Sequence, residues 1–313
     1  MVAFAIETRD MVRTFGATRA VDGVSLQVPQ GIIFGFLGPN GAGKTTTLRL
    51  LLGLLELDGG SASVLGYDVA TQSGAIRERT GVLLEHDGLY LRLSEYDNLE
   101  YYGRIYHLDT PGRQARIQEL LEHLGLWDRR GENVFSFSKG MRQKLAVARA
   151  LLHRPSVIFL DEPSAGLDPV AAVALRKDIR DLASRGGATV FLTTHNLAEA
   201  EKVCDLVGVI RRGQLVACDT PDQLRKTAQH PVVQVYGNGF SDRALAELGS
   251  LPSVRGVQTY HDHVQIEMSP GAESAPLVAL LVRAGVNVEE VRKGQASLEE
   301  AFVTLVREGE VES

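Results

Sequence analysis

The sequence predicts an α/β fold, a sheet wrapped by helices, for the stretch from Phe4 to about Lys226. Apolar runs typical of strands alternate there with helical patterns: AFAIET, VSLQV, IIFGFL, TGVLL, SVIFLD, ATVFLTT and LVGVI. Three segments carry polar residues at the end of such a run: GFLGPNG, FLDEP and FLTTH. Ligands of these sheets bind beyond the carboxyl ends of the strands. We therefore expect three strands to bring polar side chains to one edge of the sheet.

Residues from about 94 to 155 differ from their surroundings, because helical spacing dominates there, as in ARIQELLEHLGL. This segment predicts a helical insert in the α/β body. From 231 to 313 the predicted order is β-α-β-β-α-β with one helix appended, which is the order of a ferredoxin-like α+β domain. Ser297 and Glu300 are expected to form a capping box at the start of the last helix. The expected domains are therefore an α/β domain over residues 1–226 and an accessory domain over residues 231–313.

The composition is that of an ordinary soluble globular protein, with 313 residues, 44% hydrophobic and 23% charged. The net charge of −6 gives no basic field for nucleic acid. The two cysteines, Cys204 and Cys218, indicate a reducing compartment, and we expect them to be buried structural thiols. No secretory signal and no stretch of about 18 apolar residues occurs. Any action at a membrane therefore requires a partner.

A glycine-rich loop between an apolar strand and a leucine-rich helix matches the pattern G-x-x-x-x-G-K-[ST]. Its glycines let backbone N–H groups turn inward around an anion, and the helix start adds a positive dipole. Lys44 supplies a charge for the outer phosphates, and Thr45 offers a hydroxyl oxygen to Mg²⁺. The strand before the loop and the helix after it disfavour a chance match. The expected nucleotide-binding residues here are Gly38, Pro39, Asn40, Gly41, Ala42, Gly43, Lys44, Thr45 and Thr46.

Two further strand ends carry candidate catalytic groups. Asp161 and Glu162 follow the apolar run SVIFL, and transfer of a phosphoryl group to water needs one carboxylate near Mg²⁺ and one near the attacking water. Asp161 fits the metal role and Glu162 the role of general base. His195 ends ATVFLTT and is placed to donate to the γ-phosphate and to hold the water in line. Alone, such carboxylates are more often solvated strand ends and a lone histidine is usually structural, but a phosphate loop upstream favours the functional interpretation.

These motifs, together with SFSKGMRQKLAVARALLHRPSVIFLDEPSAGLDP, resemble the ATPases of ATP-binding cassette (ABC) transporters over nearly all of residues 4–226. Seven features stand in the order of that family. The resemblance implies that ATP and Mg²⁺ are bound and that ATP is hydrolysed. It also assigns roles to the candidates: adenine stacking to Phe15, a metal-binding glutamine-loop position to Glu85, the signature loop to Phe137–Met141, the metal-binding strand to Asp161 beside Glu162, the dimer-contact loop to the residues ending at Asp168, and the switch to His195.

The chain departs from the family pattern at two of these features. The family usually has glutamine at the position of Glu85, so this chain adds a negative charge near the phosphates. The signature loop usually reads Leu-Ser-Gly-Gly-Gln, whereas Lys139 and Met141 here replace a glycine and the glutamine. Ser138 and Gly140, which the resemblance implies contact the γ-phosphate, are retained. We expect the Lys139 side chain to point to solvent rather than toward the phosphate.

The resemblance also implies the partners. The phosphate loop and the signature loop of one subunit cannot share a nucleotide, so a second copy, or a homologous cassette, is expected to bring its Ser138 and Gly140 to the ATP of the first. A separate integral membrane permease is the second expected partner. Five tyrosines between Tyr90 and Tyr106 either line the groove that receives a short helix of the permease or form the core of the helical insert.

The accessory domain resembles the extension of ATPases that serve separately encoded exporters of drugs, lipids or polysaccharides. An importer ATPase with a regulatory domain is the alternative. A soluble ABC ATPase of DNA repair or translation is disfavoured by the short insert and the single phosphate loop, and a non-catalytic regulator by the complete catalytic set. The expected location is the cytoplasmic face of the cell membrane, reached through the permease.

Overall fold

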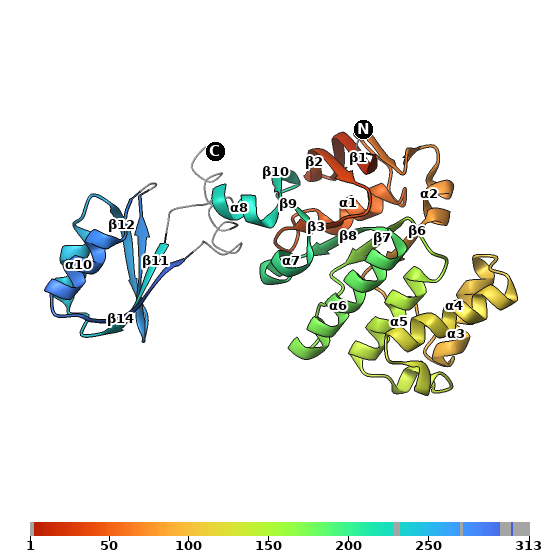
Figure 1. Ribbon diagram of the computed structural model, residues 1–313. Helices are drawn as coiled ribbons and strands as arrows, with labels where there is room; N and C mark the ends of the chain where they lie inside the picture. Colours follow the sequence, from red (N-terminus) through yellow and green to blue (C-terminus); the bar gives the residue numbers. More distant parts are fainter. Residues whose placement is uncertain (1–2, 228–231, 270–271, 295–301, 303–313) are drawn as a thin grey trace. The chain divides into compact units, whose positions relative to one another are not determined.

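The computed structural model describes residues 3–227, 232–269, 272–294 and 302 (Figure 1). The chain divides into two compact units, residues 1–220 and 221–313. The boundary precedes helix α8 (Pro221–Thr227), which the sequence analysis had placed in the α/β domain. The expected capping box of Ser297 and Glu300, with the helix that it opens, lies outside the described residues.

Two sheets form the first unit. A four-stranded antiparallel sheet has the order β2-β1-β4-β5. A six-stranded sheet has the order β10-β9-β3-β8-β7-β6, in which only β10 pairs antiparallel. The first sheet consists of β1 (Phe4–Phe15), β2 (Thr18–Pro29), β4 (Gly59–Val64) and β5 (Tyr67–Asp68). The second consists of β3 (Ile33–Leu37), β6 (Thr80–Leu83), β7 (Val157–Asp161), β8 (Thr189–Thr194), β9 (Leu206–Arg211) and β10 (Gln214–Asp219).

The parallel strands are buried on both faces, because helices cover them, and this explains their unbroken apolar sequences. Every residue of β3, β7 and β8 is buried. At the centre, the ring of Phe191 lies 5.1 Å from that of Phe34, 5.5 Å from that of Phe36 and 5.8 Å from that of Phe159, measured between centroids. The four rings come from three adjacent strands and fix the strands whose ends carry the polar residues.

The helices of the first unit include the predicted insert, which Figure 1 shows as a separate group carrying α3 and α4. The insert contains α3 (Glu95–Ile105), α4 (Thr110–His123), α5 (Lys139–Leu151) and the short 3-10 turns η1 (Trp127–Arg129) and η2 (Val134–Ser136). The other helices are α1 (Lys44–Leu51), α2 (Ser73–Arg79), α6 (Pro169–Gly186) and α7 (Leu197–Val203). In the described part of the chain, no helix combines the length and the apolar character needed to cross a membrane.

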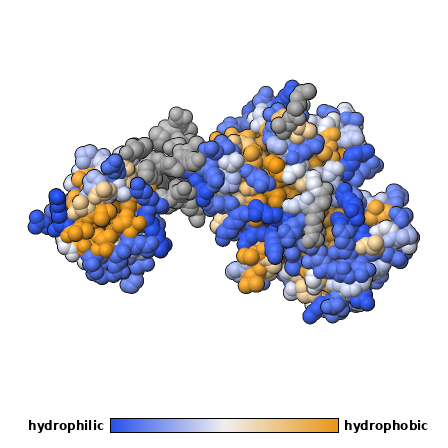
Figure 2. Space-filling model, viewed as in Figure 1, coloured by the Kyte–Doolittle hydropathy of each residue, from blue (hydrophilic) through white to orange (hydrophobic). Residues whose placement is uncertain are grey.

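The second unit places two helices on a four-stranded antiparallel sheet of order β12-β13-β11-β14. Its elements follow the chain order β-α-β-β-α-β after α8. They are β11 (Val232–Asn238), α9 (Asp242–Gly249), β12 (Val254–Thr259), β13 (His263–Met268), α10 (Ala275–Arg283) and β14 (Asn287–Gly294). The core of this unit is formed by Val235, Ile266, Leu248, Leu277 and Leu281, which are fully buried. Figure 2 shows hydrophobic residues gathered on part of its visible face.

The two cysteines differ in their surroundings. Cys204 is buried, and its sulfur lies so close to Gly35 that a Cβ at that glycine would collide with it. Burial raises the pKa of the Cys204 thiol, which keeps it protonated. Cys218 is exposed on β10, so the expectation of a buried thiol is wrong for this residue. Both are free thiols.

Candidate functional site

The glycine-rich loop joins β3 to α1, and two of its glycines are required by shape. Gly43 has a φ of 109°, in the left-handed region, and a Cβ there would overlap the carbonyl oxygen of Ala20. A Cβ at Gly38 would overlap the carbonyl oxygen of Ile210. Gly41 has a φ of 80° with open space around it, so its need is conformational only. The loop therefore lies tightly between β2 and β9, and its backbone is set before any ligand binds.

Lys44 opens α1 and turns its ammonium back over the loop. Its Nζ donates to the carbonyl oxygens of Gly38 at 2.7 Å and Pro39 at 3.2 Å. The same Nζ lies 3.2 Å from Oε1 of Glu162. The side chain is almost fully buried, so its charge is balanced by these oxygen atoms rather than by bulk water. This position puts a cation at the concave side of the loop, where the sequence predicted a contact with phosphate.

Asp161 is the last residue of β7, and its carboxylate is fixed by two threonines. Thr45 Oγ1 donates to Asp161 Oδ2 at 2.8 Å, and Thr193 Oγ1 donates to Oδ1. The structure thus joins two of the three residues predicted as metal ligands, although they are 116 positions apart. Thr193 was not singled out from the sequence, and its signal was the polar end of FLTTH, next to β7 in the sheet. The hydroxyl and carboxylate are hard oxygen donors, which suit Mg²⁺.

Glu162 and His195 meet directly, and they come from adjacent strand ends. His195 Nδ1 lies 2.7 Å from Glu162 Oε2, while Oε1 of Glu162 faces Lys44. The φ of Glu162 is 49°, a left-handed conformation that costs a non-glycine residue about 1–2 kcal/mol. Its backbone N–H donates to the carbonyl oxygen of Thr193 at 3.1 Å, which holds the strained residue in place. Strain of this kind, held by the surrounding strands, is typical of functional positions.

A buried carboxylate that the sequence analysis missed ties these strand ends together. Glu199 on α7 accepts hydrogen bonds from Ser164 Oγ at 2.5 Å and from Thr194 Oγ1 at 3.2 Å. Arg176 lies 3.7 Å from the same carboxylate. Asn196 caps α7 by accepting the N–H of Glu199, so the spacing N-x-x-E was a detectable signal. The network connects the loop that follows Glu162 to the loop that carries His195.

A cavity of about 390 Å³ brings most of the predicted groups together. Its lining includes the phosphate loop, both catalytic candidates and one residue of β2 that was not predicted: Ala20, Asn40, Gly41, Gly43, Lys44, Thr45, Thr46, Glu162, Ala165 and His195. Phe15 is not part of this lining. It lies at the β1–β2 turn, 46% exposed, and the guanidinium of Arg13 lies 4.9 Å from its ring. The ring is thus available at the surface, and its predicted stacking on adenine stays a prediction.

Glu85 follows β6 and lines a neighbouring cavity of about 370 Å³, together with Asp161 and Glu162. The predicted glutamine-loop position therefore lies on the same edge of the sheet as the other metal-ligand candidates. The carboxylate of Glu85 is exposed, whereas Asp161 is buried. Among the described residues, no group of three or more histidine, cysteine or acidic side chains is arranged to hold a metal ion alone.

Ser138 and Gly140 stand apart from the lining of the phosphate-loop cavity of their own subunit. Ser138 caps α5, where its Oγ accepts the N–H of Met141 at 3.3 Å, and it is exposed. Asp168 caps α6 by accepting the N–H groups of Ala171 at 2.9 Å and Val170 at 3.1 Å. Ser138 and Asp168 therefore each cap the start of a helix.

The tyrosine cluster of the insert is partly at the surface. Tyr90 and Tyr101 are 46% and 43% exposed, and their rings meet edge to face at 5.0 Å. Tyr102 is half-buried under the guanidinium of Arg149, and Tyr106 stacks on His153 with centroids 3.8 Å apart. Two tyrosines therefore face solvent and two pack inward, and the contact of the exposed rings with a permease stays a prediction. Leu91 and Phe135 extend the exposed apolar surface, and Phe135 is 79% exposed.

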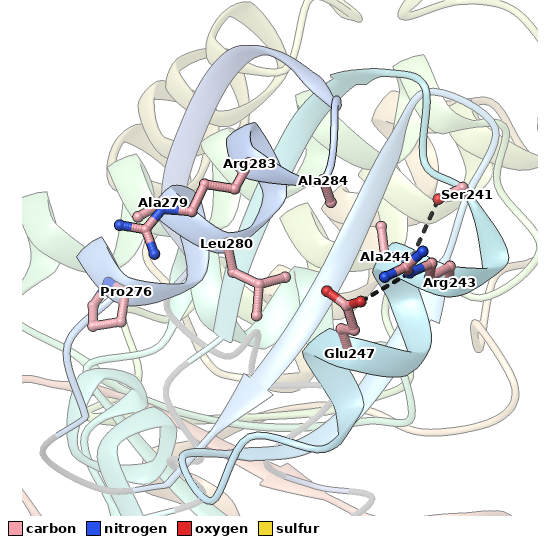
Figure 3. Close-up of a pocket in the computed structure, with 9 residues that line it drawn as sticks. All are labelled: Ser241, Arg243, Ala244, Glu247, Pro276, Ala279, Leu280, Arg283 and Ala284. Carbon is pink, nitrogen blue, oxygen red and sulfur yellow. Dashed lines mark hydrogen bonds and ion pairs between the residues drawn. The ribbon is translucent and has the colours of Figure 1, made fainter.

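A larger groove, of about 800 Å³, lies between α9 and α10 of the second unit (Figure 3). Its charged side chains are exposed, and Arg243 already pairs with Glu247 at 3.1 Å. The remaining lining is mostly alanine, proline and leucine. On β13, the ring of His263 stacks on that of Tyr260, and its Nδ1 atom lies 2.8 Å from Oδ1 of Asp262. Among the described residues, His261 and His263 belong to no group of three or more side chains that could hold a metal ion.

Comparison with known proteins gives consistent results. The family model described as "ABC transporter" matches residues 21–165. The chain is 35% identical to the daunorubicin/doxorubicin resistance ATP-binding protein of Streptomyces peucetius, covering 96% of this chain and 92% of that protein. It is 41% identical to a fluoroquinolones export ATP-binding protein of Mycobacterium tuberculosis, over 92% and 88% of the two chains. A solved ATP-binding subunit of an ABC transporter shares 32% identity at a TM-score of 0.65, covering 71% and 92%.

Proposed function

Because the chain belongs to the ATP-binding subunits of ABC transporters and is an ATPase of the α/β P-loop fold, we propose that two copies bind Mg²⁺ and ATP between them and drive export through a separate permease. The observation that carries the proposal is the joint contact of Lys44, Glu162 and His195 beside the phosphate loop. Export is supported by similarity along nearly the whole chain to proteins named for drug resistance and drug export. The importer alternative has no such support among these relatives.

The metal site that we propose consists of Thr45, Asp161 and Glu85. The Thr45 hydroxyl and the Asp161 carboxylate are already in contact at 2.8 Å, and Glu85 lines the adjoining cavity. Bound Mg²⁺ supplies charge neutralisation at the phosphates. Glu85 keeps an oxygen donor where the family pattern has glutamine, so its side chain retains the ability to contact the ion. Thr193 orients Asp161 through a hydrogen bond to the other carboxylate oxygen.

For hydrolysis, we assign the proton transfer to Glu162. Its carboxylate accepts the proton of the attacking water while Lys44 and the loop N–H groups stabilise charge on the phosphate oxygens. His195 orients Glu162 through the 2.7 Å contact and stands where it can donate to the γ-phosphate. The helix start of α1 and the loop Gly38 to Thr46 hold the nucleotide through backbone N–H groups, with the ring of Phe15 as the proposed adenine contact.

The signature residues support a two-fold dimer. Ser138 and Gly140 are exposed or half-buried at a helix start, outside the lining of the phosphate-loop cavity, so we propose that they bind the ATP of a partner subunit. Asp168 would lie in the same interface, in the loop that also contains Gly166. A homologous cassette as the second subunit satisfies the same geometry. Hydrolysis then removes γ-phosphate contacts that hold the two subunits together.

We further propose that the surface around Tyr90 and Tyr101 contacts the permease, which places the chain at the cytoplasmic face of the membrane. Residues 231–313 are proposed as a ferredoxin-like accessory domain, supported by the sheet order β12-β13-β11-β14 and the β-α-β-β-α-β chain order. We propose that this domain acts in regulation or in dimer contact. The net charge of −6 of the whole chain gives no basis for proposing nucleic-acid binding.

The test is dimerisation of the Glu162→Gln variant, which lacks the proposed base. Analytical ultracentrifugation of the full chain should show a monomer without nucleotide and a dimer with ATP and Mg²⁺. ADP and Mg²⁺ with the same variant is the matched control and should leave the monomer. The wild-type chain should hydrolyse ATP, and the variant should lose most of this activity. Retained turnover in the variant would sink the assignment of Glu162, and a variant that stays monomeric with ATP would sink the shared site.

A further inference from the structure

The cavity beside the candidate site contains opposed charges from two parts of the first unit. Its lining carries the carboxylates of Glu85, Asp87, Asp161 and Glu162 and the cations of Lys139 and Arg142. The carboxylates come from the loop after β6 and the end of β7, and the cations from the first turns of α5. A nucleotide bound nearby adds further negative charge, so the cations of this cavity influence how well a phosphate is accepted.

The four carboxylates differ in the partners that they already have. Asp161 accepts hydrogen bonds from Thr45 and Thr193, and Glu162 faces Lys44 and His195. Asp87 accepts the N–H of Leu89 at 3.1 Å. Within the described part of the chain, Glu85 has neither a hydrogen bond nor an ion pair through its carboxylate. Glu85 is therefore a carboxylate of this cavity whose charge has no partner of its own, and Asp87 has a backbone N–H group but no cation.

Lys139 is the first residue of α5, and its side chain lies along the loop that follows β7. A Cβ added at Gly166 would overlap the Nζ atom of Lys139. Gly166 has a φ of 68°, so its conformation favours glycine, whereas the flexible Lys139 side chain can move aside at little cost. The residue as a whole is exposed, as expected from the sequence, but its charged end is directed back over the loop that begins with Glu162.

We propose that Lys139 compensates, across this cavity, the negative charge that Glu85 adds to it, so that the two charges together set the affinity for magnesium-bound nucleotide. The proposal rests on the proposed function, because the nucleotide is the ligand whose affinity is set. Glu85 and Lys139 are also the positions where this chain has a charge and the family pattern has an uncharged residue. The two side chains carry opposite charges and line the same cavity. Compared with the family pattern, the two replacements together therefore leave the net charge of the cavity unchanged.

The coupling between the two residues is measurable with a double-mutant cycle in the full chain. Lys139→Gln should raise the KM for magnesium-bound ATP about three- to fivefold, as expected for a partly exposed charge pair. In the Glu85→Gln background, the same change should raise KM less than twofold. Lys139→Arg should restore the wild-type KM, because it keeps the charge. The kcat should change less than KM throughout, and about 0.5 M salt should reduce the coupling, because salt screens exposed charges.

Two control variants separate this proposal from its rivals. Lys177→Gln removes an exposed lysine of α6 outside the cavity and should leave KM unchanged. Arg142→Gln removes the other cation of the cavity and should act equally in both Glu85 backgrounds. Equal effects of Lys139→Gln in the two backgrounds, or coupling of Glu85 to Arg142 instead, overturn the proposal. A wild-type chain that fails to bind magnesium-bound ATP overturns the proposed function itself, so the two failures are distinguishable.

Discussion

The two units of this chain use their sheets in different ways. In the first unit, β3, β7 and β8 are buried along their whole length, and the polar residues that matter follow where these strands end. In the second unit, buried or half-buried residues and exposed ones are mixed along the antiparallel strands, and polar residues are spread along them, as in β11 and β12. A doubly covered parallel sheet concentrates its chemistry at one edge, whereas a sheet with one open face spreads polar groups over a surface.

The electrostatics of the units differ accordingly. Lys44 and Asp161 of the first unit are buried charges, and each has a partner from a distant part of the chain, Glu162 for Lys44 and Thr45 for Asp161. In the second unit, described ion pairs such as Arg292 with Glu290 and Arg243 with Glu247 are exposed and local in sequence. Exposed pairs contribute about 0–1 kcal/mol each. We therefore expect substitutions to impair activity in the first unit and only local stability in the second.

The largest effect is expected for His195→Ala. This change removes the group that orients Glu162 at 2.7 Å, and we expect kcat for ATP hydrolysis to fall about 10²-fold, in line with losses at other stabilising donors. Steady-state kinetics of the full chain measure it, with ATP binding followed in parallel. His261→Ala, in the second unit, is the matched control and should leave kcat unchanged. An unaltered kcat in His195→Ala would mean that the strand-end contact has no catalytic role.

The second prediction concerns the core of the second unit. Leu281 on α10 is fully buried against the sheet, so Leu281→Ala should destabilise this unit by about 2–5 kcal/mol. Hydrogen exchange of the full chain should show faster exchange in β11 and β13 and unchanged exchange in β3 and β7. Basal ATP hydrolysis should stay as in the wild type. Equal acceleration in both units would contradict the separation that the contacts indicate.

The third prediction concerns a buried acid in the helical insert. Glu95 opens α3 with both carboxylate oxygens buried and without a hydrogen-bond partner in the described part of the chain. Burial and the nearby charge of Glu132 raise its pKa to about 7, against the opposing effect of Arg129 and Arg130. The folded chain therefore holds this proton more tightly than the unfolded chain. The stabilisation that comes from this bound proton is fully present below pH 4.5, the pKa of the unfolded chain. It is lost as the pH rises through about 7, the pKa of the folded chain.

Glu95→Gln should remove that loss. We expect the variant to be more stable than the wild type by about 1–2 kcal/mol above pH 7, and the difference to vanish near pH 4. Denaturant unfolding between pH 4 and pH 8 measures it. Glu122→Gln, an exposed residue of α4, is the control and should show no such pH dependence. A difference that is independent of pH would rule out the ionisation of Glu95 as its cause.

Much of the site was predictable, because its residues belong to local patterns. The phosphate loop, Asp161, Glu162 and His195 each follow an apolar run, and an apolar run can be recognised without knowing its neighbours. Contacts between such segments were not predictable. Glu199 was not singled out from the sequence, where its spacing from Asn196 indicates only a helix cap. In the structure, its carboxylate accepts hydrogen bonds from both Ser164 and Thr194. The direction of the Lys139 side chain likewise depends on the loop around Gly166, which is distant in sequence.

The fold shows the same limit. Strand β4 (Gly59–Val64) begins with two glycines and a serine, residues that disfavour strands, and it was not predicted from the sequence. It exists because β1 pairs with it from Ile6 to Val12. Strands that carry their own apolar pattern, such as β7 and β8, were predicted with nearly their observed bounds. Local composition therefore determined the buried parallel strands, whereas pairing with a partner strand determined β4 inside the antiparallel sheet.

The smallest effect on the chain itself is expected at the tyrosine surface, which lies in the first unit but away from its strand ends. Tyr101 is exposed and contacts Tyr90 edge to face at 5.0 Å, an interaction worth about 0.5–1.5 kcal/mol at most. Tyr101→Ala should thus change basal ATP hydrolysis less than twofold. With the co-expressed permease, transport should fall several-fold more, because the exposed ring is lost from the contact.

Tyr260→Ala provides the control for this comparison, since Tyr260 is similarly exposed at 47% and lies in the second unit. It should lower neither basal hydrolysis nor transport by more than twofold. If the two variants reduce transport equally, the effect comes from general destabilisation rather than from docking at Tyr101. If Tyr101→Ala reduces basal hydrolysis as strongly as transport, the ring supports the fold of the insert and the surface is not the permease contact. If Tyr101→Ala loses transport but keeps ATP hydrolysis, the helical insert couples the ATPase to the permease, and catalysis depends on the strand ends.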